Sequence, residues 1–158
     1  SLNSLEGMSF ALSQGDNKMR ATIFEKIVEK KGSVPTLIHP SANVSKYAQL
    51  GRGVVVHMNT VVHPDVTVGD NTVLSYNVSV THSTHIGKNC YLAFGVMLGA
   101  YTIVEDFVFI GIGAIVISGK VDSIGTFASI GAGAVVTKSV ASYECVAGNP
   151  AKFIKTLK

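Results

Sequence analysis

Residues 62–92 read VHPDVTVGDNTVLSYNVSVTHSTHIGKNCYL, and every sixth residue, counted from the first, is aliphatic. The same step continues in both directions over residues 38–116 without a miss. Small residues such as Thr72 and Cys90 stand two positions before many of these aliphatic residues. A period of six that does not drift fits neither a helix of 3.6 residues per turn nor a simple alternating strand. The aliphatic positions are Ile38, Val44, Leu50, Val56, Val62, Val68, Leu74, Val80, Ile86, Leu92, Leu98, Val104, Ile110 and Val116.

This period predicts an all-β solenoid, a parallel β-helix of hexapeptide repeats in which each coil stacks on the previous one. Three six-residue sides make one coil, so residues eighteen apart are expected to stack in three inward-facing columns. After Val116 the next aliphatic positions are Ile124, Ile130 and Val136, so two additional residues are expected in a loop at 118–123. We interpret this loop as a tolerated insertion, with the border of a ligand groove as the alternative.

The chain is expected to divide into three parts. Residues 1–35 are interpreted as a partial α/β segment, the remnant of a Rossmann-like subdomain, with a strand at 8–14 and a helix at 19–31. Its first turn lacks the glycines of a nucleotide site. Residues 36–146 are expected to form the β-helix. Residues 147–158 are expected to form a C-terminal tail or short basic helix that covers the open end of the solenoid.

The composition restricts the function class. The 158 residues carry a net charge of +3, and their basic residues form no run, which argues against a nucleic-acid-binding protein. No apolar run approaches the ~20 residues of a membrane-spanning helix, and no signal peptide is recognisable. Cys90, at a small inward-facing position, is expected to be a buried thiol. With Cys145 it gives no disulfide framework, so a cytoplasmic location is expected.

Several segments carry a family likeness that covers residues 10–158. They are GDNK (15–18), TLIHPSA (36–42), VTH (80–82), IG (86–87), IGAGAVVTK (130–138) and GNPAK (148–152). With the hexapeptide period, they resemble the left-handed β-helix acyltransferases, and within these the NeuD/PglD-type sugar acetyltransferases. The resemblance implies a left-handed, homotrimeric enzyme of surface-polysaccharide biosynthesis. It also implies transfer of an acetyl group from acetyl-CoA to an amino group of a nucleotide-linked sugar.

The resemblance implies that His82 is the general base and that the backbone N–H of Ala100, eighteen residues later, stabilises the oxyanion. In the family an acidic residue follows the base, whereas Ser83 follows it here and can orient the ring without a charge. Taken on the residues alone, His82 is more simply an exposed turn histidine. The other histidines lack metal-ligand spacing, so no metal is expected, and a γ-carbonic anhydrase-like protein is disfavoured. They are His39, His57, His63 and His85.

Acetyl-CoA is expected along the later coils. For each glycine there, the alternative is a repeat corner that needs positive φ, and for each lysine a solvated surface. Two other functions stay open: O-acetylation of a sialic acid-like sugar, and a catalytically impaired hexapeptide scaffold, which Ser83 makes conceivable. The candidates for the pantetheine arm are Gly111, Ile112, Gly113, Gly131 and Ala132, and those for the phosphates or the adenine end are Lys138 and Lys152.

Overall fold

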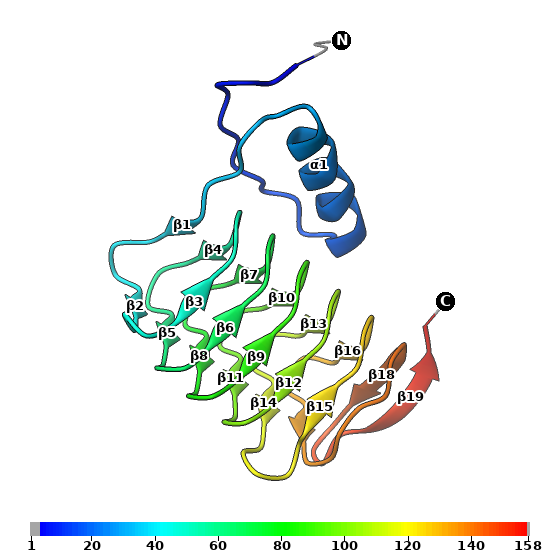
Figure 1. The fold of residues 1–158 in the computed structure, drawn as a ribbon. Helices are drawn as coiled ribbons and strands as arrows, with labels where there is room; N and C mark the ends of the chain where they lie inside the picture. Colours follow the sequence, from blue (N-terminus) through cyan, green and yellow to red (C-terminus); the bar gives the residue numbers. More distant parts are fainter. Residues whose placement is uncertain (1–3, 158) are drawn as a thin grey trace.

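The computed structural model describes residues 4–157. Helix α1 (Asn17–Glu29) lies alongside a stack of coils, against the corners of several of them, and a β-hairpin lies at the C-terminal end of the stack (Figure 1). The coils contribute short strands to three sheets, which form the sides of a prism. The prediction of an all-β solenoid with parallel strands is therefore confirmed. Within residues 4–157, no helix is both long enough and apolar enough to cross a membrane.

We name the sheets by the order in which the chain enters them. The first sheet has the spatial order β1 (Leu37–Ile38), β4 (Val55–Val56), β7 (Val73–Leu74), β10 (Tyr91–Leu92), β13 (Phe109–Ile110), β16 (Ser129–Ile130), β18 (Glu144–Ala147) and β19 (Lys152–Thr156). The second sheet contains β2 (Asn43–Val44), β5 (Val61–Val62), β8 (Ser79–Val80), β11 (Met97–Leu98), β14 (Ile115–Val116) and β17 (Val135–Val136). The third sheet contains β3 (Gln49–Leu50), β6 (Thr67–Val68), β9 (His85–Ile86), β12 (Ile103–Val104) and β15 (Ser123–Ile124).

The register follows the sequence period. Val55 pairs with Val73, eighteen residues later, and this spacing recurs along the stack. Ile103 pairs with Ser123, twenty residues later, because the loop between β14 and β15 adds two residues, as the sequence predicts. The inward-facing residues form one continuous apolar core. Fully burying an aliphatic side chain contributes ~1.5–3 kcal/mol, so this core is the main source of the solenoid's stability.

Helix α1 packs against the side of the solenoid and against the chain that leads into the first coil. Asp16 caps it, and its carboxylate accepts a hydrogen bond from the N–H of Met19 at 2.8 Å. Phe24 and Ile27 pack with Val34 in a second, smaller core. The cap therefore stabilises the start of the helix, and the apolar packing fixes the helix against the chain that leads into the first coil.

The structure differs from the sequence prediction near both ends. The expected strand at 8–14 is reduced to a single bridge between Ser9 and Ser33, because the chain finds no further backbone partner there among the described residues. For residues 147–158 the sequence predicts a tail or a short helix, and the helix is wrong. Residues 152–156 form β19, antiparallel to β18, because the turn before them sends the chain back along the free edge of β18.

Candidate active site

One edge of the prism, between the second and third sheets, carries the candidate base. The strands β8, β11, β14 and β17 pair in register, so the corner residues that follow them also stack. Neighbouring coils are about 4.8 Å apart, as parallel strands are. We call this row the His82 edge. Two positions beyond the inward-facing residue of each strand stand, in order, His82, Ala100, Ser118 and Lys138.

His82 is exposed on this edge. Its Nδ1 atom lies 3.3 Å from the hydroxyl oxygen of Ser83, and its ring meets the ring of Tyr101 edge-on, with centroids 5.3 Å apart. No hydrogen bond within residues 4–157 engages its Nε2 atom. The ring is therefore in contact with Ser83 through Nδ1 and with the ring of Tyr101, while Nε2 makes no hydrogen bond to the described residues.

Ala100 lies one coil beyond His82, where the sequence places the oxyanion donor. Its backbone N–H donates a hydrogen bond to the hydroxyl oxygen of Ser118 at 2.8 Å. The backbone N–H that the sequence analysis expects to be the oxyanion donor therefore already has an acceptor within the chain, the Ser118 hydroxyl. The sequence analysis missed Ser118, although a second count of eighteen from Ala100 leads to it.

A hollow of about 180 Å³ lies on the second sheet beside this edge. Met97, Ile115 and Ile117 form much of its wall, and Ser118 borders it. The hydroxyl of Thr81, which also lines it, donates to the carbonyl of Leu98. An apolar wall next to an imidazole and a backbone N–H suits a short acyl group or the end of a thioester arm.

The candidate residues for the pantetheine arm lie on another edge. Residues 111–113 form the corner just before β14, and residues 131–133 the corner just before β17. We call this row the glycine edge. Ile112 is 57% exposed there. Because β14 and β17 run from the glycine edge to the His82 edge, the second sheet separates the two edges within one chain.

The two candidate lysines are divided between these edges. Lys138 stands on the His82 edge, two coils beyond Ala100. Lys152 begins β19 and pairs with Ala147 of β18. A Cβ built on Gly131 would lie 2.7 Å from the Cβ of Ala147, so Lys152 belongs near the glycine edge.

The remaining histidines have other surroundings. The His57 ring lies 4.5 Å from that of Tyr76, and burial, together with nearby His39, lowers the pKa of His57. His85 faces outward from the third sheet and bonds to Thr67. No group of three metal-binding side chains occurs within residues 4–157.

The prediction that Cys90 is a buried thiol is confirmed. Burial raises the pKa of the Cys90 thiol to about 12. A thiol of this kind is protonated at neutral pH, and the thiolate is the nucleophilic form of cysteine. Cys90, buried and protonated, is therefore not a candidate for an acyl-accepting nucleophile.

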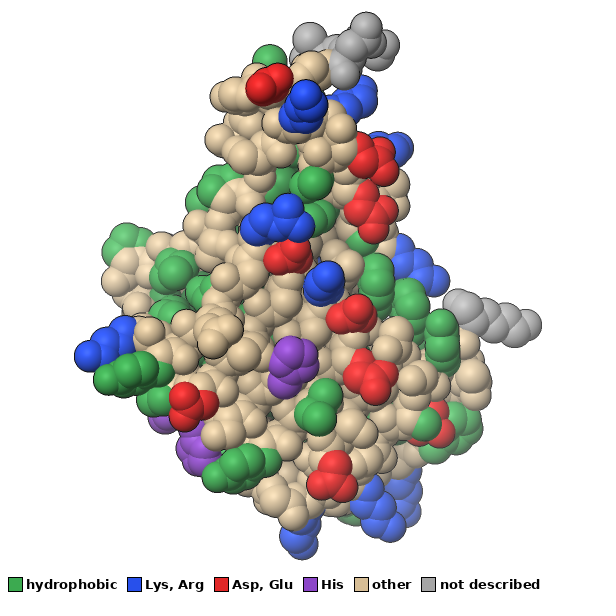
Figure 2. All heavy atoms as spheres, viewed as in Figure 1, with side chains coloured by type: hydrophobic (Ala, Val, Ile, Leu, Met, Phe, Trp, Pro, Cys, Tyr) green, Lys and Arg blue, Asp and Glu red, His purple; other side chains and the backbone are tan. Residues whose placement is uncertain are grey.

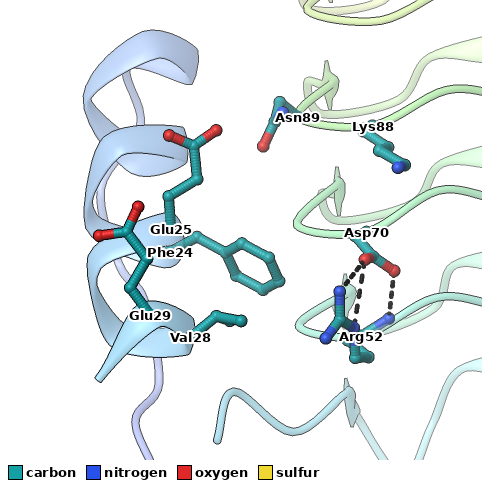
Figure 3. A pocket seen from close by; sticks show the side chains of 8 residues that line it. All are labelled: Phe24, Glu25, Val28, Glu29, Arg52, Asp70, Lys88 and Asn89. Atoms are coloured by element: carbon teal, nitrogen blue, oxygen red, sulfur yellow. Dashed lines mark hydrogen bonds and ion pairs between the residues drawn. The ribbon is translucent and has the colours of Figure 1, made fainter. Parts of the chain in front are cut away.

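A second hollow, of about 270 Å³, lies between α1 and the corners that follow the third sheet (Figure 3). Glu25 and Glu29 project from the helix, opposite Arg52 and Lys88 on the coils. Arg52 forms an ion pair with Asp70 at 2.8 Å. None of the candidate site residues lines this hollow, so it is separate from the His82 edge.

The surface charge shows no basic patch on the face seen in Figure 2. Lysine and arginine side chains are interspersed there with aspartate and glutamate. A protein that binds nucleic acid needs a continuous basic surface to neutralise phosphates. This face offers none.

Comparisons with known proteins identify the family. The family model described as bacterial transferase hexapeptide (six repeats) matches residues 47–82. The acetyltransferase domain of PglB from Neisseria gonorrhoeae FA1090 is 30% identical, with a TM-score of 0.88, over 91% of this chain and 69% of that chain. The same domain has been solved in complex with acetyl coenzyme A, with a TM-score of 0.87. No curated protein sequence matches the chain.

Two further structures extend the likeness. A histidine-to-alanine variant of GDP-perosamine N-acetyltransferase from Caulobacter crescentus, in complex with CoA and GDP-perosamine, is 28% identical, with a TM-score of 0.78, over 94% of this chain and 70% of that chain. WeeI from Acinetobacter baumannii AYE is 24% identical over 92% of this chain and 70% of that chain. Its TM-score of 0.89 shows likeness of fold. The chain belongs to the left-handed β-helix, hexapeptide-repeat sugar acetyltransferases.

Proposed function

We propose that the protein transfers the acetyl group of acetyl-CoA to an amino group of a nucleotide-linked sugar. The likeness to an acetyltransferase domain solved with acetyl coenzyme A supports the donor. The likeness to an N-acetyltransferase solved with CoA and GDP-perosamine supports a sugar amine as the acceptor. The observation that carries the proposal is the stacking of His82 directly before the backbone N–H of Ala100 on one exposed edge.

The reaction requires a base and an oxyanion donor, and this edge supplies both. The sugar amine attacks the thioester carbonyl carbon, a C–N bond forms, and the π electron pair moves to the carbonyl oxygen. Nε2 of His82 takes the proton from the attacking nitrogen. The N–H of Ala100 stabilises the oxyanion. Collapse breaks the C–S bond, and the departing CoA thiolate takes the proton from the His82 imidazolium.

Ser83 orients the base in this scheme. When Nδ1 of His82 carries the ring proton and donates it to the Ser83 hydroxyl, Nε2 keeps the lone pair that a base needs. The orienting group is neutral, so we expect this enzyme to be slower than one that has a carboxylate at this position. If Ser83 supports no catalysis at all, the protein is a catalytically impaired scaffold, and a transfer assay distinguishes it from a slow enzyme.

The acyl donor is expected to lie between two copies of the chain. Gly111, Ile112 and Gly113 stand one sheet away from His82, so a single chain does not bring its two candidate edges together. A second copy that places its glycine edge against the His82 edge completes the groove. Gly131, Ala132 and Lys152 then belong to the glycine edge, and Lys138 to the His82 edge. A homotrimer gives three such sites, and light scattering in solution tests it against a monomer.

The proposed setting is the bacterial cytoplasm, in surface-polysaccharide biosynthesis. The free thiols of Cys90 and Cys145 suit a reducing compartment. A nucleotide sugar and acetyl-CoA are both anionic, which agrees with the positive net charge of +3.

The test is a thiol-release assay with acetyl-CoA and a panel of nucleotide-linked 4-amino sugars, with the corresponding 4-hydroxy sugars and a sialic acid as competitors. Transfer to an amino sugar is the expected result. The His82→Ala variant is expected to lose at least a hundredfold in kcat and to keep its affinity for CoA. The matched control is His85→Ala, because His85 faces outward from the third sheet. Transfer only to hydroxyl groups, no transfer at all, or near-normal turnover by His82→Ala would each contradict the proposal.

A further inference from the structure

The hydroxyl oxygen of Ser118 lies where the oxyanion of the proposed acetyl transfer would bind to the N–H of Ala100. It lies 2.8 Å from the nitrogen of Ala100, on the accepting side of that N–H. An oxyanion bound by the same N–H sits roughly 2.7–3.1 Å from the nitrogen. The free chain therefore holds a hydroxyl group where the proposed reaction places a negatively charged oxygen.

The backbone of Ser118 is fixed beneath this position. The N–H of Gly99 donates to the carbonyl of Val116 at 3.0 Å, and a Cβ built on Gly99 would lie only 2.5 Å from the nitrogen of Ser118. The two coils are thus in backbone contact at this corner. Rotation about the Cα–Cβ bond of Ser118 is the motion left to the hydroxyl.

The proton of this hydroxyl is available. Ser118 is exposed, and no described residue accepts a hydrogen bond from it. The nearby hydroxyl of Thr81 differs, because it donates to the carbonyl of Leu98. Ser79, the third hydroxyl on the wall of the 180 Å³ hollow, stands on β8 and makes no hydrogen bond to Ala100. Ser118 is therefore the hydroxyl on this wall that both contacts the Ala100 N–H and has a proton to give.

We propose that Ser118 is a catalytic residue, the second hydrogen-bond donor to the oxyanion. When the thioester enters, the side chain turns by about 120° to a neighbouring rotamer. This turn frees the N–H of Ala100 for the carbonyl oxygen and lets the hydroxyl donate to the same oxygen. Its proton stays on the hydroxyl throughout, and the transferred proton follows the route through His82. This inference rests on the proposed acetyl transfer.

The energetic reason is the charge that develops on the carbonyl oxygen. Hydrogen bonds to a charged acceptor are roughly twice as strong as those between neutral groups. Ser118 therefore exchanges a neutral bond from Ala100 for a stronger bond to the oxyanion, and Ala100 makes the same exchange. Loss of one donor from a site of this kind lowers kcat by roughly a hundredfold or more, and less where the donor is exposed to solvent.

The test compares Ser118→Ala and Ser118→Thr with the wild-type chain, using acetyl-CoA and the best acceptor of the panel. Ser118→Ala is expected to lower kcat by about tenfold to a hundredfold. Its KM for both substrates and the pH profile of kcat/KM are expected to stay the same. Ser118→Thr keeps the hydroxyl and is expected to stay within about threefold of wild type. The matched control is Ser129→Ala, a serine that faces outward from the first sheet.

The kinetics of these variants separate a donor role of Ser118 from a binding role and from failure of the proposed function. An active wild-type chain with Ser118→Ala equally fast or faster would overturn this inference alone, because the hydroxyl would then only fill the oxyanion position or compete for it. A rise in KM without a fall in kcat would overturn it in favour of a binding role. If Ser118→Ala loses its thermal stability, the Thr variant decides by keeping or losing kcat. A wild-type chain without transfer would overturn the proposed function, and this inference with it.

Discussion

The Nδ1 atom of His82 lies 3.3 Å from the hydroxyl oxygen of Ser83, at a corner where Ser83 adopts a φ of +56°. A hydroxyl can accept the Nδ1 proton and so fix the tautomer in which Nε2 is the base. It carries no charge, however, and the contact is long. The imidazolium that forms during the reaction therefore receives little stabilisation from this partner.

The Ser83→Asp variant is expected to be a faster enzyme. A carboxylate next to His82 favours its charged form and so raises the pKa of the imidazole. The plateau value of kcat should rise by about threefold to tenfold, and the acid limb of the pH–rate profile should move to higher pH. Aspartate is the suitable choice because it tolerates the left-handed backbone that this corner requires. Steady-state kinetics from pH 5 to 9 measures both effects.

Ser83→Asn is the matched control, since it has the shape of aspartate without the charge. It should leave the acid limb in place. Identical behaviour of the two variants would show that charge at this position does not act on the base.

Arg20 fastens the N-terminal segment to the solenoid. Its side chain is 1% exposed and donates to the carbonyls of Asn71, Asn89 and Cys90, at 3.1, 3.2 and 3.1 Å. Arg20→Met leaves these carbonyls without their donor and should destabilise the docking of α1 by ~2–4 kcal/mol. The coils have their own core, so they should stay folded. Limited proteolysis should therefore cut the chain before Thr36 much faster than in wild type.

The control is Arg52→Met on the same side of the molecule. The side chain of Arg52 is 67% exposed, and its ion pair with Asp70 is a surface one, worth at most about 1 kcal/mol. This variant should keep its resistance to proteolysis. Equal sensitivity of both variants would mean that the buried contacts of Arg20 are not what holds the segment.

The sequence predicts the coils of the solenoid well, but it does not predict how α1 docks on them or that β19 is a strand. The six-residue step places Leu74 and Ile86 in the core, and both are 0% exposed, because one inward residue per side is a geometric requirement of the fold. The contacts of Arg20 leave no such periodic mark, since carbonyl groups of any residue can accept them. Strand β19 is exposed along its whole length, so it lacks the alternation by which strands are recognised.

The corners and the candidate site show the same limit. Asparagine and glycine are expected where φ is positive, yet Tyr101, Phe107 and Phe127 adopt φ values of 61°, 60° and 60°. The regular coils over-determine these corners, whatever residue stands there. The spacing of eighteen does predict that Ala100 follows His82. The hydrogen bond from Ala100 to Ser118 depends on a side-chain rotamer, which the sequence period does not encode.

Gly99 is expected to be intolerant of any side chain. A Cβ there would lie 2.5 Å from the nitrogen of Ser118 and 2.6 Å from the carbonyl oxygen of Val116. Both are backbone atoms of the next coil, so Gly99→Ala must push two coils apart, at a cost of ~1–3 kcal/mol. Gly15→Ala is the control, because nothing lies within 4 Å of its built Cβ. Thermal unfolding should show a lower Tm for the first variant only, and an unchanged Tm for Gly99→Ala would contradict the close approach of the coils.

Two carboxylates are expected to make the fold sensitive to strong acid. Burial alone would raise the pKa of Asp70, but the hydrogen bonds and charge of Arg52 outweigh it and lower this pKa. Hydrogen bonds from the side chain and backbone of Thr126 lower the pKa of Glu105. Both folded-state pKa values thus lie below the unfolded ones, so this stability is complete above about pH 5 and is lost as the pH falls further. Thermal unfolding is measured between pH 2 and 5. As the pH falls, the Tm of Asp70→Asn and of Glu105→Gln should each drop less than the Tm of the wild type. A slope of Tm against pH equal to that of the wild type would contradict the assignment.

His57 is expected to contribute an earlier loss of stability. Burial, and then the neighbouring His39, lower its pKa in the folded chain, so the unfolded chain binds its proton more readily. Stability should therefore be constant above the unfolded pKa of about 6.5 and should fall as the pH drops below it, until the folded chain is protonated as well. His57→Gln should remove this part of the fall and leave the one below about pH 5 in place. Thermal unfolding at intervals from pH 8 to 5 measures it, with His63→Gln as the control, because the ring contact with Tyr76 belongs to His57. A wild-type slope in His57→Gln over this range would mean that the desolvated imidazole is not the group responsible.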